Sequence, residues 1–206
     1  MTAPMKISCI LLDSIEYADA ARYAELLPPS RRSKIARLRF DRDKLLSLAA
    51  GLLIRAEAGE DEPVLDEHGK PYFEGSGVHF SVSHSGRCAA IAVDDAEVGV
   101  DVEQLPDRDF LKIARRFYHP NELHDVEAAQ DQPRAFTRIW TRKEAYLKQL
   151  GVGITTDLSA FDTTSGELSA RIASFDLDGY VLSVCSADNI LDKNIDISKL
   201  ELKDLV

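Results

Sequence analysis

The sequence predicts an α+β fold built as a pseudo-twofold duplication, in which each half is a helix packed on a small antiparallel sheet. The first observation is a pattern that occurs twice, near residues 44–103 and again near residues 133–186: a long helical stretch followed by three short strand-like runs. The second is the short turns between the runs of the first copy, which favour antiparallel neighbours. Helices kept apart from antiparallel strands are typical of the α+β class.

The first half is expected to span residues 1–103. A strand at residues 6–13 precedes a helix at residues 44–58, which Gly59 terminates. Three further runs predict an antiparallel meander with strands at residues 79–84, 87–93 and 97–103. The last run has one buried face, because apolar and polar residues alternate in Val98, Gly99, Val100, Asp101, Val102 and Glu103.

The second half is expected to span residues 104–206. Helices are predicted at residues 110–117 and 121–129, and Pro120 opens the second of them. A longer helix at residues 133–150 ends at Gly151, the residue type that most favours a helix C-terminus. Strand-like runs near residues 159–163, 168–173 and 180–186 complete the second copy.

The composition is that of an ordinary globular protein and excludes several classes of function. With 206 residues, of which 45% are hydrophobic, the chain can bury one good core or two small ones. A net charge of −10 argues against nucleic-acid binding, and no apolar run reaches the length of a membrane span or a signal-peptide core. The three cysteines, Cys9, Cys88 and Cys185, lack metal-ligand spacing, so we expect buried free thiols in the cytoplasm.

A basic block stands out in this acidic chain. Its cations are Arg31, Arg32, Lys34, Arg37, Arg39, Arg42 and Lys44, against only Asp41 and Asp43. Such a block indicates a local anion site, either for phosphates or for an acidic partner surface. A solvated helix face explains the block equally well when it is taken alone.

Residues 140–148, with the sequence Trp-Thr-Arg-Lys-Glu-Ala-Tyr-Leu-Lys, are the most informative part of the long second helix. Glu144 and Lys148 are one turn apart and share a face with Trp140. Lys143 falls in the adjoining apolar stripe and needs a partner if it is buried. By itself the motif is more typical of an ion pair on a solvated helix.

Asp101 and Glu103 point to one side of their strand, roughly 7 Å apart. At an effective dielectric constant near 20 they repel by about 2 kcal/mol, so in a cleft they would need a cation. Sparse oxygen ligands suit Mg²⁺, which keeps several waters and borrows phosphate oxygens. Without a cleft, the pair is more typical of a solvated face.

Two weaker motifs lie in the first half. The loop Gly69-Lys70-Pro71 offers the cation of Lys70, and Ser83-His84 ends a strand, where His84 can donate to a phosphate. Each alone also fits a structural role.

Together and in this order, these segments resemble the Sfp-type 4′-phosphopantetheinyl transferases. The matching pieces are residues 69–71, 83–84, 99–103 and 140–148, and the basic block leading into Ser47 matches more loosely. The resemblance covers about residues 28–186. Arg31 stands where other members carry lysine.

The resemblance implies a pseudo-twofold α+β monomer that transfers 4′-phosphopantetheine from coenzyme A to a serine of an apo acyl or peptidyl carrier protein, and releases adenosine 3′,5′-bisphosphate. It implies Mg²⁺, with Mn²⁺ as a substitute, held by Asp101, Glu103 and Glu144. Glu144 would also be the catalytic base, directly or through water, and Lys148 the catalytic cation. The implied coenzyme A contacts are Arg31, Lys34, Ser47, Lys70, Pro71, Ser83, His84 and Lys148.

Two other functions remain open at this point. A non-catalytic module that binds coenzyme A or a carrier protein would be expected to lose a metal ligand or Lys148, and this chain retains them. A Mg²⁺-dependent hydrolase of nucleotide pyrophosphates could use the same carboxylates. No nucleic-acid or membrane partner is expected.

Overall fold

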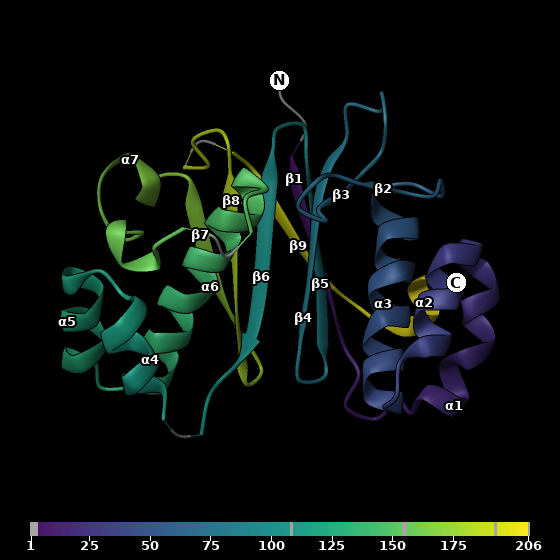
Figure 1. Ribbon diagram of the computed structural model, residues 1–206, viewed down its shortest axis with the longest axis horizontal. Helices are drawn as coiled ribbons and strands as arrows, with labels where there is room; N and C mark the ends of the chain where they lie inside the picture. Colours follow the sequence, from purple (N-terminus) through teal and green to yellow (C-terminus); the bar gives the residue numbers. More distant parts are fainter. Residues whose placement is uncertain (1–3, 108, 154–155, 192, 206) are drawn as a thin grey trace.

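The computed structural model describes residues 4–107, 109–153, 156–191 and 193–205, which form a mixed α+β protein with two main sheets between two groups of helices (Figure 1). The first sheet has the strand order β4-β5-β1-β9, in which β1 runs antiparallel to β5 and parallel to β9. Its strands are β1 (Met5–Leu11), β4 (His79–Ser85), β5 (Cys88–Asp94) and β9 (Ile195–Leu200). The antiparallel second sheet contains, in the order β6-β8-β7, the strands β6 (Val98–Gln104), β8 (Tyr180–Ser186) and β7 (Ile172–Leu177).

The helices lie on the outer faces of the two sheets (Figure 1). On the side of the first sheet lie α1 (Tyr17–Ala20), α2 (Pro29–Arg37) and α3 (Asp41–Glu57), of which α3 packs on the sheet while α1 and α2 pack on α3. On the side of the second sheet lie α4 (Phe110–Phe117), α5 (Pro120–Ala128), α6 (Gln132–Leu150) and α7 (Gly166–Ser169). Short 3₁₀ helices occur at Ala21–Leu26, Leu158–Ala160 and Leu202–Leu205, and a small hairpin joins β2 (Val64–Leu65) to β3 (Pro71–Tyr72). None of the described helices is long and apolar enough to cross a membrane.

The inner faces of the two sheets share one apolar core. Ile7 and Cys9 of β1 pack in it with Val100 and Val102 of β6. The opposite face of the first sheet packs on α3, which contributes Leu48 and Leu52. Burial of such apolar faces is the main force that holds these layers together.

The predicted helices and most predicted strands are confirmed, and the α+β class with them. The long helix of the second half runs from Gln132 to Leu150. At its N-terminus the side chain of Asp131 accepts the N–H of Arg134, and at its C-terminus Gly151 adopts a left-handed φ of 69°. These features explain both ends, since an aspartate caps exposed N–H groups and glycine adopts positive φ without steric cost.

The predicted three-stranded meander of the first half is wrong. β4 and β5 form the expected hairpin, but β6 pairs with β8 in the second sheet rather than with β5. The reason is that β6 needs cover on both faces: its valines enter the core between the sheets, while its other face meets α6. A two-residue turn such as Asp94-Asp95 permits a hairpin but does not require one.

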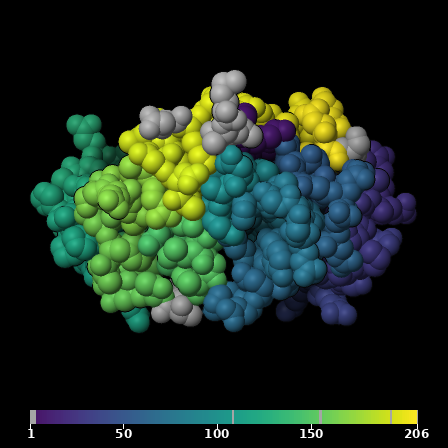
Figure 2. Space-filling view, turned by 90° about the horizontal axis from the view of Figure 1, so that it is seen from above, coloured from purple at the N-terminus to yellow at the C-terminus, as the bar shows by residue number. Residues whose placement is uncertain are grey.

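Two further strand predictions need correction. The run at residues 159–163 begins inside the 3₁₀ helix Leu158–Ala160, because the Asp157 side chain accepts the N–H of Ser159 and closes a turn. The run at residues 168–173 starts in α7 and becomes a strand only at Ile172. Strand β9 was not predicted from the sequence. It returns residues from the C-terminal part to the first sheet. In the space-filling view, yellow C-terminal residues lie on both sides of the middle of the molecule (Figure 2).

Candidate functional site

The site begins at the seam where β4 and β6 lie side by side. Here three serines of β4 bond to β6. Ser81 Oγ accepts the N–H of Val100 at 3.1 Å, and Ser83 Oγ donates to Asp101 Oδ1 at 2.8 Å. Ser85 Oγ donates to a Glu103 carboxylate oxygen at 2.5 Å and accepts the N–H of Gln104. The seam therefore holds both carboxylates of β6 by side-chain hydrogen bonds.

Helix α6 lies directly against β6 because Gly99 has no side chain. A Cβ at this position would lie 2.0 Å from the carbonyl oxygen of Ala145 and 2.3 Å from the backbone nitrogen of Gln149. Those distances are far inside van der Waals contact, so no other residue fits without moving the helix. This approach brings Glu144 and Lys148 to the carboxylates of β6.

Lys148 binds Asp101 rather than serving as a plain surface cation. Its Nζ lies 2.6 Å from Asp101 Oδ1 and 2.9 Å from Ser83 Oγ. The Lys148 side chain is 32% exposed, whereas that of Asp101 is 4% exposed. Lys148 is therefore not part of an ion pair on a solvated helix face, which is the arrangement that the motif alone favoured.

The carboxylates outnumber this cation. Asp101 Oδ2 and Glu144 Oε1 are buried without a hydrogen-bond partner. Desolvation, followed by the charge of Asp101, raises the pKa of Glu144 to about 7. Desolvation also raises the pKa of Glu103, against the lowering effect of the Ser85 hydrogen bond. Buried like charges of this kind favour protonation or a bound cation.

The residues fit a divalent cation, although their present arrangement is not a closed ligand set. Among the described residues, no three His, Cys, Asp or Glu side chains are drawn together as metal ligands. The two unpartnered buried oxygens, one on Asp101 and one on Glu144, nevertheless supply the hard, anionic donors that Mg²⁺ requires.

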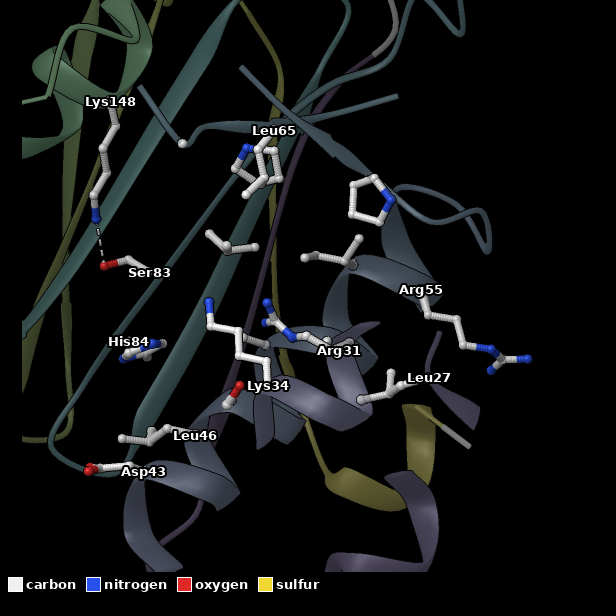
Figure 3. Close-up of a pocket in the computed structure, with 18 of the residues that line it drawn as sticks. Leu27, Arg31, Lys34, Asp43, Leu46, Arg55, Leu65, Ser83, His84 and Lys148 are labelled. Atoms are coloured by element: carbon white, nitrogen blue, oxygen red, sulfur yellow. Dashed lines mark hydrogen bonds between the residues drawn. The ribbon is translucent and has the colours of Figure 1, made fainter. Parts of the chain in front are cut away.

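A cavity of about 1110 Å³ opens beside these carboxylates. Figure 3 shows Arg31, Lys34 and His84 around it, with Lys148 bonded to Ser83 at another wall. Of the residues predicted from the sequence, the following line this cavity: Arg31, Lys34, Ser47, Pro71, Ser83, His84, Asp101, Glu103, Glu144 and Lys148. One cavity thus joins a cationic wall to an anionic cluster.

Arg31, Lys34 and His84 form the cationic wall, and none of the three has an ion pair with a described residue. The Nε of Arg31 is buried without a hydrogen-bond partner, and desolvation lowers the pKa of its guanidinium. Desolvation by the cavity walls also lowers the pKa of His84, although its ring reaches solvent, and the charges of Lys148 and Arg31 add to this effect. Such groups gain most from an anionic ligand, because it satisfies both the orphan donor and the uncompensated charge.

Lys70 is the predicted site residue that the structure places elsewhere. Its Nζ lies 2.6 Å from Glu97 and 3.3 Å from the carbonyl oxygen of Gln149. Together with Pro71, Glu144 and Lys148 it lines a second cavity of about 320 Å³. Its charge is therefore already compensated by Glu97, and it faces the smaller of the two cavities.

Sequence reasoning missed three residues of this region. Arg42 and Arg55 also line the large cavity, and Ser85 holds Glu103. Arg42 belongs to the basic block, so its charge was visible, but nothing separated it from neighbours that face solvent. The alternation Ser81-x-Ser83-x-Ser85 was the available signal for the seam, because alternate residues of a strand share a face.

Lys143, five residues before Lys148, is buried and forms an ion pair with Glu122. Its Nζ lies 2.7 Å from Glu122 of α5, and both side chains are fully buried. It also donates to the carbonyl oxygens of Leu158 and Phe161, each at 2.7 Å. This second ion pair fastens α6 to α5 and to the 3₁₀ segment.

Sequence comparisons with known proteins give a consistent result. Residues 97–196 match the sequence family described as the 4′-phosphopantetheinyl transferase superfamily. A 4′-phosphopantetheinyl transferase of Bacillus pumilus is 31% identical over 225 residues, which covers 96% of this chain and 96% of that protein. One from Salmonella typhimurium is 38% identical over 140 residues, or 66% of this chain and 72% of that protein. The solved structure of Thermotoga maritima holo-acyl-carrier-protein synthase is similar over 43% of this chain and 61% of that chain, at 16% identity and a TM-score of 0.37.

Proposed function

Because this chain belongs to the 4′-phosphopantetheinyl transferase superfamily, we propose that it transfers 4′-phosphopantetheine from coenzyme A to a serine of an acyl or peptidyl carrier protein. The other product is adenosine 3′,5′-bisphosphate. The observation that carries the proposal is that one cavity is lined both by cationic side chains and by a carboxylate cluster. Glu144 and Lys148 lie at the wall where the cluster is found. A phosphate-rich substrate and a divalent cation are the natural occupants of such a cavity.

Coenzyme A would bind with its phosphates toward the cationic wall. Arg31, Lys34, Ser47 and His84 are the proposed contacts, chiefly to the 3′-phosphate, with Pro71 beside the adenine. The unpartnered Nε of Arg31 supports this assignment, since a phosphate oxygen is the acceptor that a buried guanidinium N–H prefers.

A magnesium ion, or manganese in its place, would be held by Asp101, Glu103 and Glu144. When bound, such an ion polarises phosphoryl oxygens and neutralises charge that develops on the leaving group. The unpartnered oxygens of Asp101 and Glu144 support the assignment.

In the proposed reaction, residues of this chain accept a proton and neutralise charge. The serine oxygen of the carrier bonds to the pantetheine-bearing phosphorus, and the bond from that phosphorus to the bridging oxygen breaks. Glu144 accepts the serine proton, directly or through water. Lys148 neutralises the oxygens of the departing bisphosphate. The chain needs no nucleophile of its own, because the partner brings it.

We propose that the two halves of the chain supply different residues of the site. Residues 1–103 supply the phosphate contacts and two carboxylates, and residues 104–206 supply Glu144 and Lys148, in a pseudo-twofold monomer. The two long helices, one on the outer face of each sheet, support this duplication. Three free, buried cysteines support a reducing compartment such as the cytoplasm.

One experiment separates this function from its rivals. The protein is incubated with coenzyme A and Mg²⁺, with and without an apo carrier protein, and all species are followed by intact mass. A transferase loads the carrier and releases adenosine 3′,5′-bisphosphate only when the carrier is present. A pyrophosphate hydrolase releases it without the carrier, and a binding module releases nothing. A panel of apo carriers then identifies the preferred acceptor.

A further inference from the structure

The contact between Lys148 and Asp101 places an ammonium group on a carboxylate that a metal would also bind. Asp101 Oδ1 already accepts from Lys148 Nζ at 2.6 Å and from Ser83 Oγ at 2.8 Å, which leaves Oδ2 as its free oxygen. The described carboxylates form no closed metal-ligand group in this state. An ammonium group and a divalent cation at this carboxylate repel each other, so they compete for it.

The two partners of this contact differ in their freedom to move. Asp101 is buried on β6, and Ser83 holds it by a hydrogen bond that does not depend on the lysine. Lys148 is at the end of a flexible side chain that is one-third exposed and lines the large cavity. If either group shifts when ligands bind, it is therefore the ammonium of Lys148, and the space open to it is the cavity.

We infer that Lys148 is the resident counter-ion of the carboxylate cluster: its ammonium neutralises Asp101 while no divalent cation is bound, and moves to the phosphates of coenzyme A when one binds. The second part rests on the proposed function. The inference has a thermodynamic consequence. Coenzyme A gives the displaced ammonium a new anionic partner, so the metal and coenzyme A must each tighten the binding of the other by the same factor.

The test measures binding rather than turnover, with Mn²⁺ alone as the probe and water-proton relaxation as the readout. In Lys148→Met the metal no longer has to displace an ammonium group, so its Kd in the absence of coenzyme A should fall by about tenfold relative to wild type. A charge-assisted hydrogen bond of this kind corresponds to at least about this factor. Added coenzyme A should then tighten Mn²⁺ binding less in the variant than in wild type.

The control is Lys34→Met, which removes the same charge from another wall of the same cavity and should leave the Mn²⁺ Kd unchanged. Lys148→Gln, with a polar head at the exposed position, replaces Lys148→Met if that variant does not fold. An unchanged or weaker Mn²⁺ affinity without lysine 148 overturns the inference. An equal gain in Lys34→Met also overturns it, because the effect would then come from the general field.

The proposed function and the counter-ion role of Lys148 are tested by different measurements. Transfer to a carrier by the wild-type protein tests that function without reference to metal affinity. The Mn²⁺ result without coenzyme A tests the counter-ion role whether or not transfer occurs.

Discussion

Two lysines on helix α6 bind carboxylates in opposite ways. Lys143 and Glu122 are both fully buried, and the remaining donors of the ammonium reach two backbone carbonyls. Glu122 in turn accepts from the backbone N–H groups of His119 and Thr163. Lys148 instead faces a cavity and meets a cluster in which two buried carboxylate oxygens have no partner.

The difference teaches how to separate a structural ion pair from a functional one. A fully satisfied pair such as that of Lys143 has nothing left to bind, and breaking it leaves one buried charge without compensation. The Lys148 cluster is incompletely satisfied, which costs stability but leaves charge available for ligands. Incomplete satisfaction in a cavity, rather than the presence of an ion pair, is the signal of function.

The sharpest way to break the comparison is to remove a carboxylate from the incomplete cluster. Asp101→Ala or Glu103→Ala should abolish Mg²⁺-dependent transfer, because each removes a proposed ligand. The fold should persist, since the valines of β6 carry its packing. Transfer assays across a Mg²⁺ series, beside circular dichroism, measure both. Wild-type activity in either variant would refute the metal assignment.

Glu144→Gln should have the next largest effect, a fall in kcat of roughly 10²–10⁴. Glutamine keeps the shape and one oxygen ligand but cannot accept the serine proton. Binding of Mg²⁺ and coenzyme A should stay within about tenfold of wild type. Calorimetry of coenzyme A binding and single-turnover transfer distinguish the two roles of Glu144. Rescue to near the wild-type rate by extra Mg²⁺ would rule out the base role.

For the satisfied pair, Lys143→Met should lower the free energy of unfolding by about 3–5 kcal/mol, because Glu122 is left as a buried charge. The KM for coenzyme A should hardly change where the variant remains folded. Urea unfolding supplies the measurement, with Lys148→Met as the matched variant on the same helix. A loss for Lys143→Met no larger than that of Lys148→Met would contradict the distinction between the two lysines.

The smallest expected effect is a pH dependence of stability that originates in Glu144. Its pKa is about 7 in the folded protein, against 4.5 for an ordinary glutamate, so the folded state keeps a proton that the unfolded state releases. This contribution to stability is complete below about pH 4.5 and is lost as the pH rises through 7. The urea midpoint without metal should therefore fall more steeply from pH 5 to pH 8 in wild type than in Glu144→Gln. Identical slopes would show that Glu144 does not titrate in this range.

The sequence was sufficient for much of the local structure and for most members of the candidate site. Periodicity and the flanking proline and glycine located α6 to within one residue at its start, and alternation placed Asp101 and Glu103 on one side of β6. The resemblance to the Sfp-type transferases pointed to ten residues that line one cavity.

The sequence could not predict which residues that lie far apart along the chain contact one another. The alternation of β6 shows that one face is buried, but it does not reveal that β8 rather than β5 is the neighbour. Lys143 evidently needed a partner, yet Glu122 looked like an ordinary helix residue until the fold buried it. Lys70 was visible as a loop cation, but its ion pair with Glu97 depends on where the hairpin lies.

The parallel pairing of β9 with β1 has a consequence for how the protein is made. During synthesis β1 leaves the ribosome long before β9, since Met5 pairs with Ile195 and Ile10 with Leu200. The β4-β5-β1 part of the first sheet can form early, but the other edge of β1 stays open until β9 has left the ribosome. An open strand edge invites pairing with other chains. The edge of β1 is therefore available to other chains in the interval before β9 emerges, and afterwards only β9 presents an edge on that side of the sheet.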